Sequence, residues 1–139
     1  MRILQWVPVP TGPFGLPRLM LSAFAALWLG HGAGAQTAEL VMVEQHGCHW
    51  CEAWNAEVAA IYPKTAEGRF APLRRIDLRA PVPMDLSLDG RAVFTPTFIL
   101  VQDGRELARM EGYGGDELFW WGLSALLAEH TDFKGGEGE

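Results

Sequence analysis

The two cysteines of this 139-residue chain are separated by two residues, in the order Cys48-His49-Trp50-Cys51. A C-x-x-C pair at a strand-to-helix junction is typical of thiol redox chemistry. The free N–H groups and the positive dipole end at a helix N-terminus favour an anion, so this place stabilises a thiolate at Cys48. Cys51 follows one turn later, on the apolar side of the predicted helix. We therefore expect Cys48 to attack and Cys51 to resolve, with no cofactor beyond their own redox-active disulfide.

Two histidines flank the first cysteine, and His46 and His49 are close enough to donate to its thiolate or to carry charge in acid. Two other interpretations of the cysteine pair stay open. A structural disulfide would close only a four-residue loop, worth about 2 kcal/mol against about 3 for fifteen residues. A zinc or copper ion would need both histidines as ligands, and four ligands within six residues hardly surround an ion tetrahedrally. Covalent haem attachment fails because residue 52 is Glu, not the His it requires.

Strands and helices alternate around this motif. Residues 39–45 form a β-branched, apolar run that predicts a buried strand, and apolar side chains at helical spacing predict a helix over 51–61, limited by Pro63. Asp103-Gly104 predicts a hairpin turn, and Asp116 is the expected cap of the last helix. The remaining predicted elements are strands at 73–78, 97–102 and 106–111, a short helix around 84–88, and a final helix over 116–129.

The first part of the chain has the layout of a secretory signal peptide. Residues 19–30 are without charge, Arg18 precedes them, and Ala33-Gly34-Ala35 follows as a small-x-small cleavage site. The apolar run is shorter than the ~20 residues that span a bilayer as a helix. We expect residues 1–35 to be removed before Gln36, with an uncleaved membrane anchor as the alternative. Export would place the protein where disulfides persist.

Composition limits the remaining choices. Lys and Arg total 11 against 17 Asp and Glu, a net charge of −6, which becomes −8 when Arg2 and Arg18 leave with the leader. This acidity argues against a nucleic-acid partner, and 49% hydrophobic with 11% aromatic residues excludes a disordered protein. The length suits a single domain, which we assign to residues 36–131. Residues 132–139, rich in Gly and Glu, are expected to be a disordered tail.

A second signal lies at Phe94-Thr95-Pro96-Thr97, where Pro96 opens a predicted strand. Together with the C-x-x-C helix, the Asp-Gly hairpin and the closing helix, it resembles the thioredoxin superfamily. The resemblance implies an α/β fold of the minimal thioredoxin type, βαβ(α)ββα, with a mixed four-stranded sheet flanked by helices. It also implies that Pro96 is cis and faces the disulfide. The backbone of Thr95, beside Trp50, would pair with an extended substrate segment.

The chain departs from the family pattern at two places. Gly47 stands where a Trp usually precedes the first cysteine, and Met42 stands at the position of the buried carboxylate of thioredoxins. Proton transfer from Cys51 must then use another base, and Glu44 lies on the same strand face as Met42. The central His-Trp dipeptide leaves the direction of electron flow open.

Two further segments, Tyr62-Pro63-Lys64-Thr65 and Glu111-Gly112-Tyr113, are similar to the periplasmic SoxS-type thioredoxins of bacterial sulfur-oxidation (Sox) clusters. That resemblance implies a periplasmic reductase that acts on protein thiols and disulfides. It would keep the cysteine of the Sox sulfur-carrier protein active, and a membrane electron-transfer protein would reduce it. The alternative functions are a thioredoxin-like binding module with an inert disulfide and a metal-delivery module.

Overall fold

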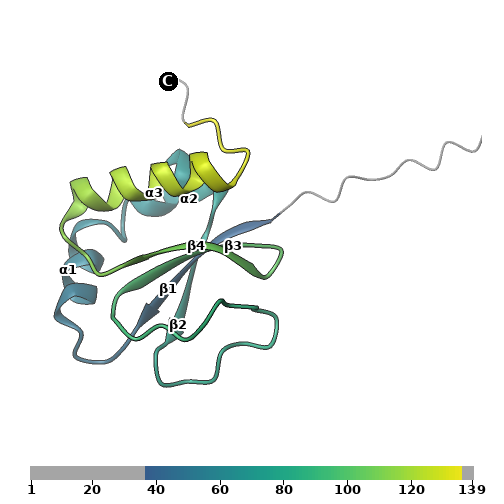
Figure 1. Ribbon diagram of the computed structural model, residues 1–139. Helices are drawn as coiled ribbons and strands as arrows, with labels where there is room; N and C mark the ends of the chain where they lie inside the picture. The colour runs from purple at the N-terminus through teal and green to yellow at the C-terminus, as the bar shows by residue number, and fades with distance from the viewer. Residues whose placement is uncertain (1–36, 136–139) are drawn as a thin grey trace, which may run out of the picture. The chain divides into compact units, whose positions relative to one another are not determined.

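The computed structural model describes residues 37–135, drawn in colour in Figure 1. The expected signal peptide, its cleavage site and the last four residues of the expected tail lie outside this range. The described elements are β1 (Ala38–Glu44), α1 (His49–Glu57), the 3-10 helix η1 (Tyr62–Lys64), α2 (Ala66–Phe70), β2 (Leu73–Asp77), β3 (Thr97–Gln102), β4 (Arg105–Glu111) and α3 (Asp116–His130).

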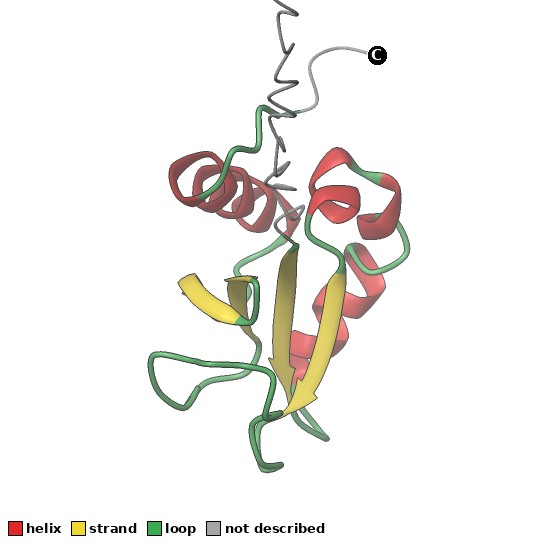
Figure 2. Ribbon diagram, turned by 90° about the vertical axis from the view of Figure 1, so that its right-hand side faces the viewer, coloured by secondary structure: helices red, strands yellow, loops and turns green. Residues whose placement is uncertain are grey.

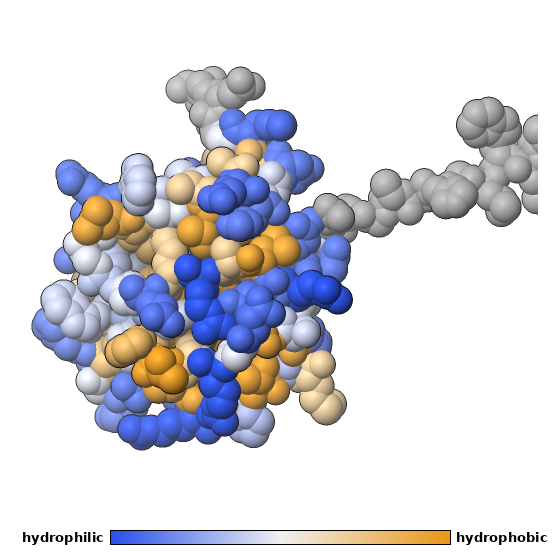
Figure 3. Space-filling model, viewed as in Figure 1, coloured by the Kyte–Doolittle hydropathy of each residue, from blue (hydrophilic) through white to orange (hydrophobic). Residues whose placement is uncertain are grey.

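The four strands form one mixed sheet in the order β2-β1-β3-β4. β1 and β2 are parallel, whereas β3 is antiparallel to both β1 and β4. The central strands β1 and β3 are the apolar runs of the sequence and are almost wholly buried, while the edge strands carry the charges. Hydrophilic side chains cross the middle of the face in Figure 3, over β4, and such charges on an edge strand oppose pairing with other chains. The predicted sheet is confirmed.

The two faces of the sheet are covered differently (Figures 1 and 2). The helices cover one face, where Trp54 of α1 and Phe119 of α3 pack on Phe98 of β3, with ring centroids 4.9–5.6 Å apart. The long connection between β2 and β3 covers the other face without a helix. It buries Leu86 against the odd-numbered side chains of β1 and β3, in the cluster Val41, Val43, Ile99 and Val101.

This long connection is fastened to β4. The backbone N–H of Ser87 donates to the carbonyl of Gly104 (2.7 Å), and Glu106 N–H donates to the carbonyl of Ser87 (3.0 Å). The Glu106 side chain is 3% exposed, pairs with Arg109 and accepts the N–H of Asp89 at 2.8 Å. The expected helix at 84–88 is therefore wrong, because the segment makes a turn at residues 84–85 and then pairs with Arg105 at Ser87.

Two other predicted elements need correction. The helix expected over 51–61 begins at His49 and ends at Glu57, and a 3-10 turn and the short α2 follow it. The Thr65 hydroxyl group caps α2 by accepting the Gly68 N–H at 3.0 Å. A prediction from the spacing of apolar residues does not take such a cap into account. In α3 the cap is Gly115, and Asp116 is the first helical residue. Within residues 37–135, no helix is long and apolar enough to cross a membrane.

Candidate active site

Cys48 stands at the N-terminus of α1 because the chain turns sharply after β1. Gly47 makes that turn with φ = +72°, a conformation that a side chain disfavours. Cys48 is the N-cap of α1, and its Sγ accepts the backbone N–H of Cys51 at 3.1 Å. The sulfur thus takes the place of a capping oxygen among the free N–H groups of the first turn, which favour a negative charge.

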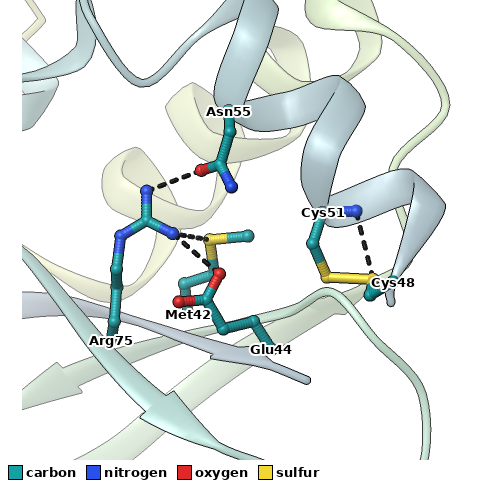
Figure 4. Close-up of polar contacts among 6 residues, drawn as sticks. All are labelled: Met42, Glu44, Cys48, Cys51, Asn55 and Arg75. Carbon is teal, nitrogen blue, oxygen red and sulfur yellow. Dashed lines mark hydrogen bonds and ion pairs between the residues drawn. A yellow bond between two sulfur atoms is a disulfide. The ribbon is translucent and has the colours of Figure 1, made fainter. Parts of the chain in front are cut away.

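The two cysteines form a disulfide, drawn in Figure 4. Cys48 is 7% exposed and Cys51 only 3%, and both belong to the core cluster between the helices and the sheet. Cys48 therefore lies nearer the surface, at the very end of the helix, whereas Cys51 lies one turn inside it. The order of attack expected from the sequence, Cys48 before Cys51, stays a prediction.

The loop before β3 lies beside the cysteine loop. The Thr95–Pro96 peptide bond is cis, as the family resemblance implied. The register places Thr97 opposite Val43, and the Gln45 side-chain amide donates to the Thr95 hydroxyl oxygen at 3.2 Å. The carbonyl of Pro96 accepts the N–H of Gly112 at 2.7 Å. Three loops therefore meet at one end of the sheet, around the residues predicted to bind substrate.

The backbone of Thr95 is available at this place. Thr95 is half-buried, and within residues 37–135 its backbone N–H and C=O groups make no hydrogen bond. A half-exposed loop residue with a free donor and a free acceptor can pair with an added strand.

The rim of the site is aromatic and exposed. The Trp50 side chain is 55% exposed, and the His49 ring meets it edge-on, 5.3 Å between centroids. Phe94, directly before Thr95, is 59% exposed. His46 and His49 are both exposed, and in the described part of the chain neither donates a hydrogen bond to the Cys48 sulfur.

A polar cluster centred on Arg75 of β2 lies between the sheet and α1, the helix that begins at the disulfide (Figure 4). The Arg75 guanidinium donates to Glu44 Oε2 at 2.8 Å and to Asn55 Oδ1 at 2.7 Å, and it lies 3.7 Å from Met42 Sδ. Glu44 and Met42 do lie on the same face of β1. Sequence reasoning missed Arg75 and Asn55, because their meeting depends on the parallel register that sets Met42 opposite Arg75.

Tyr62 and Tyr113 come from the two segments that suggested the subfamily, and their hydroxyl groups connect elements around the site by hydrogen bonds. The Tyr62 hydroxyl group donates to the Ala71 carbonyl at 2.6 Å, and burial raises the pKa of this phenol. The Tyr113 hydroxyl group donates to Glu57 at the end of α1. Burial and this hydrogen bond raise the pKa of Tyr113 as well. Both phenols are therefore neutral donors that fix α1 and α2 to the rest of the fold.

No group of three or more His, Cys, Asp or Glu side chains among the described residues could hold a metal ion. What the geometry presents instead is a cysteine pair at a helix N-terminus, a cis-proline loop with a free backbone edge, and a four-stranded sheet. Together these define a thiol-disulfide oxidoreductase with a thioredoxin-like fold.

Comparison with known proteins supports this class. No family model and no curated protein matches the chain. Among solved structures, the chain is similar to the crystal structure of the periplasmic thioredoxin SoxS from Paracoccus pantotrophus in its reduced form. The sequences are 44% identical with a TM-score of 0.65, over 66% of this chain and 97% of that chain. The chain therefore belongs to the thioredoxin superfamily, as a SoxS-like protein.

Proposed function

We propose that the protein is exported to the periplasm and reduces the disulfide-blocked cysteine of a Sox sulfur-carrier protein. The observation that carries this proposal is the 44% identity with a protein described as a periplasmic thioredoxin SoxS, which is covered over 97% of its length. The apolar leader with its Ala33-Gly34-Ala35 site supports export. A membrane electron-transfer protein would supply the electrons.

In the proposed reaction the Cys48 thiolate attacks the substrate disulfide, and the first substrate sulfur leaves as a thiolate that takes a proton from water. Cys51 then loses its proton and attacks Cys48 Sγ, which breaks the mixed disulfide and releases the second substrate thiol. Glu44 is the proposed proton acceptor for Cys51. His46 and His49 are proposed to support the Cys48 thiolate by donating hydrogen bonds to it.

The substrate segment is proposed to bind as an extended strand on the Thr95 backbone, between Pro96 and Trp50. Main-chain hydrogen bonds of this kind accept a cysteine on a flexible tail more readily than one buried in a folded core. The acidic domain offers little general attraction to acidic partners, so selectivity comes from the contacts of the substrate segment with Thr95, Pro96 and Trp50, and salt affects capture weakly.

The test is capture in the native periplasm with Cys51→Ser, which cannot release a mixed disulfide from Cys48. We expect the sulfur carrier among the captured proteins, and reduced wild-type protein should restore carrier that a disulfide has inactivated. Capture of many unrelated disulfide proteins without the carrier would make this a general thiol enzyme instead. Cys48→Ser, which removes the attacking sulfur but retains the fold, is the matched control.

A separate measurement tests export. The intact mass of the exported protein should lack residues 1–35, as expected for cleavage between Ala35 and Gln36. A membrane-bound form that keeps the leader would contradict it. A stoichiometric metal in the purified protein would favour metal delivery over thiol exchange.

A further inference from the structure

Gln45 links two of the loops that meet at the disulfide. It is the first residue after β1, and its carbonyl accepts the N–H of Cys48 at 3.3 Å. That bond closes a turn over residues 45–48, the cysteine turn, in which Gly47 has φ = +72°. The Gln45 side-chain amide donates to the Thr95 hydroxyl oxygen at 3.2 Å. One residue thus holds Cys48 with its backbone and Thr95 with its side chain.

The hydrogen bond to the Thr95 hydroxyl group also restrains the Thr95 backbone. Threonine is branched at Cβ and stiff about χ1, so a contact that holds its hydroxyl oxygen limits the movement of the backbone next to it. The N–H and C=O groups that are free to pair with a substrate strand belong to this same residue. Gln45 therefore sets the place of these groups relative to Cys48.

Other contacts keep the loop before β3 folded without Gln45. The Thr97 hydroxyl group donates to the Phe94 carbonyl at 2.8 Å, and the Pro96 carbonyl accepts the N–H of Gly112 at 2.7 Å. The second bond joins the loop to the segment after β4, and β4 is the neighbour of β3 on the side opposite β1. Within residues 37–135, the Gln45 amide makes the only side-chain hydrogen bond between this loop and the cysteine turn. Its loss should therefore change the spacing of the two loops more than the stability of the fold.

We propose that Gln45 is a positioning residue that favours extended peptide disulfides as substrates, because it holds the free backbone groups of Thr95 at a fixed place relative to the Cys48 sulfur. This inference rests on the proposed thiol-disulfide exchange. A substrate strand that pairs with Thr95 brings its sulfur to Cys48 only while the two loops keep their spacing, and a misplacement of about 1 Å is enough to slow a reaction. A disulfide without peptide groups cannot pair with Thr95 and gains nothing from this spacing.

The reaction that measures this effect is oxidation of the reduced full-length protein by a disulfide reagent. The Cys48 thiolate bonds to one reagent sulfur, and the other reagent sulfur leaves with the electron pair and takes up a proton. Cys51 then loses its proton and bonds to Cys48, so the first reagent sulfur leaves as a thiolate and is protonated in turn. The protein dithiol is oxidised to the disulfide, and the reagent is reduced to two thiols.

The experiment compares two uncharged reagents. One is the symmetrical disulfide of a short peptide with a central cysteine, which offers main-chain groups to Thr95. The other is bis(2-hydroxyethyl) disulfide, which has no peptide group. The selectivity of the protein is the second-order rate constant with the peptide divided by that with the small disulfide, both from acid-quenched samples. A general change in the reactivity of Cys48 cancels in this ratio.

We expect Gln45→Met, which keeps the length of the side chain but loses the amide, to lower the selectivity about threefold to tenfold. This range corresponds to the loss of one hydrogen bond between neutral groups. The rate with the small disulfide should change less than about twofold. Thr95→Val, which loses the hydroxyl group, should lower the selectivity by a similar factor, whereas Thr95→Ser should retain most of it. The double variant Gln45→Met/Thr95→Val should be no less selective than the less selective single variant, because both changes remove the same bond.

Thr37→Val is the matched control. Thr37 lies at the opposite end of β1 from Gln45, and its hydroxyl group donates to the Asp103 carboxylate at 3.5 Å. The change therefore removes a similar hydroxyl contact far from the cysteine turn, and it should leave the selectivity unchanged. Equal slowing with both reagents, or unchanged rates with both, in folded Gln45→Met protein would overturn the inference while leaving the proposed function intact. Absence of any reaction of the wild-type protein with either reagent would instead overturn the proposed function.

Discussion

Gly68 lies inside α2, at the closest approach between this helix and the 3-10 turn before it. A Cβ atom at this position would stand 1.8 Å from the Tyr62 carbonyl oxygen, where real contacts are not under 3.0 Å. That oxygen also accepts the N–H and the hydroxyl group of Thr65, at 3.1 and 2.9 Å. The backbone must therefore move by more than about 1 Å, against hydrogen bonds that cap α2, to admit a methyl group.

The sign of the Gly68→Ala effect follows from two opposed terms. Replacing Gly by Ala inside a helix ordinarily gains about 0.5–1 kcal/mol, whereas overpacking typically costs about 1–3 kcal/mol. Because the atom to be displaced is backbone, we take the upper part of that cost. The expected net loss is about 1–2 kcal/mol in the free energy of unfolding, or a Tm roughly 5–15 °C lower for a domain of this size.

Thermal and urea unfolding followed by circular dichroism measure this loss. Gly122→Ala in α3 is the matched control, because its Cβ would meet only the Met110 side chain, whose sulfur lies 2.6 Å away. That flexible thioether can rotate away, so the control should change stability by less than about 1 kcal/mol. A Gly68→Ala protein as stable as wild type would refute the close approach described here.

Three further outcomes are expected. In the reduced protein, Cys48 should be alkylated much faster than Cys51 at pH 7, because only Cys48 caps the helix; equal rates would count against its use as the nucleophile. The chain has two tyrosines, and the pKa of each is raised, so ultraviolet titration of the folded protein should show little phenolate at pH 10. The two neutral phenols should stabilise the fold below pH 10, and this contribution should be lost as the pH rises further. Half-ionised tyrosine in folded protein at pH 10 would contradict this. Tyr62→Phe should cost about 1–2 kcal/mol by leaving the buried Ala71 carbonyl without its donor, more than Tyr113→Phe, and an equal effect of the two changes would argue against it.

Much of the fold follows from local patterns in the sequence. The strand at residues 97–102 has its predicted bounds, because an apolar run between Pro96 and Asp103-Gly104 leaves little choice of ends. The C-x-x-C pair lies at a helix N-terminus, as its place after an apolar strand predicts. The hydrophobic spacing, however, predicted a helix that extends beyond the end of α1, because Val58 is buried although it lies after the last helical residue.

The parts that escaped prediction depend on tertiary contacts. The segment around Leu86 was expected to be helical, but its conformation is set by pairing with β4, far away in sequence. Arg74 and Arg75 are alike in sequence, and only the parallel register with β1 decides which of them meets Glu44. Charged residues on an edge strand are usually solvated, so their sequence carries no sign of a site.

The intact mass of single-cysteine variants after reaction with a disulfide-linked peptide tests whether Cys48 attacks and Cys51 resolves. Reduced Cys51→Ser should gain one peptide through a mixed disulfide at Cys48 within the time that wild-type protein takes to become oxidised. Cys48→Ser should gain the peptide far more slowly, because the Cys51 sulfur is buried and does not cap the helix. Equal adduct formation by both variants, or by neither, would contradict these roles of the two cysteines.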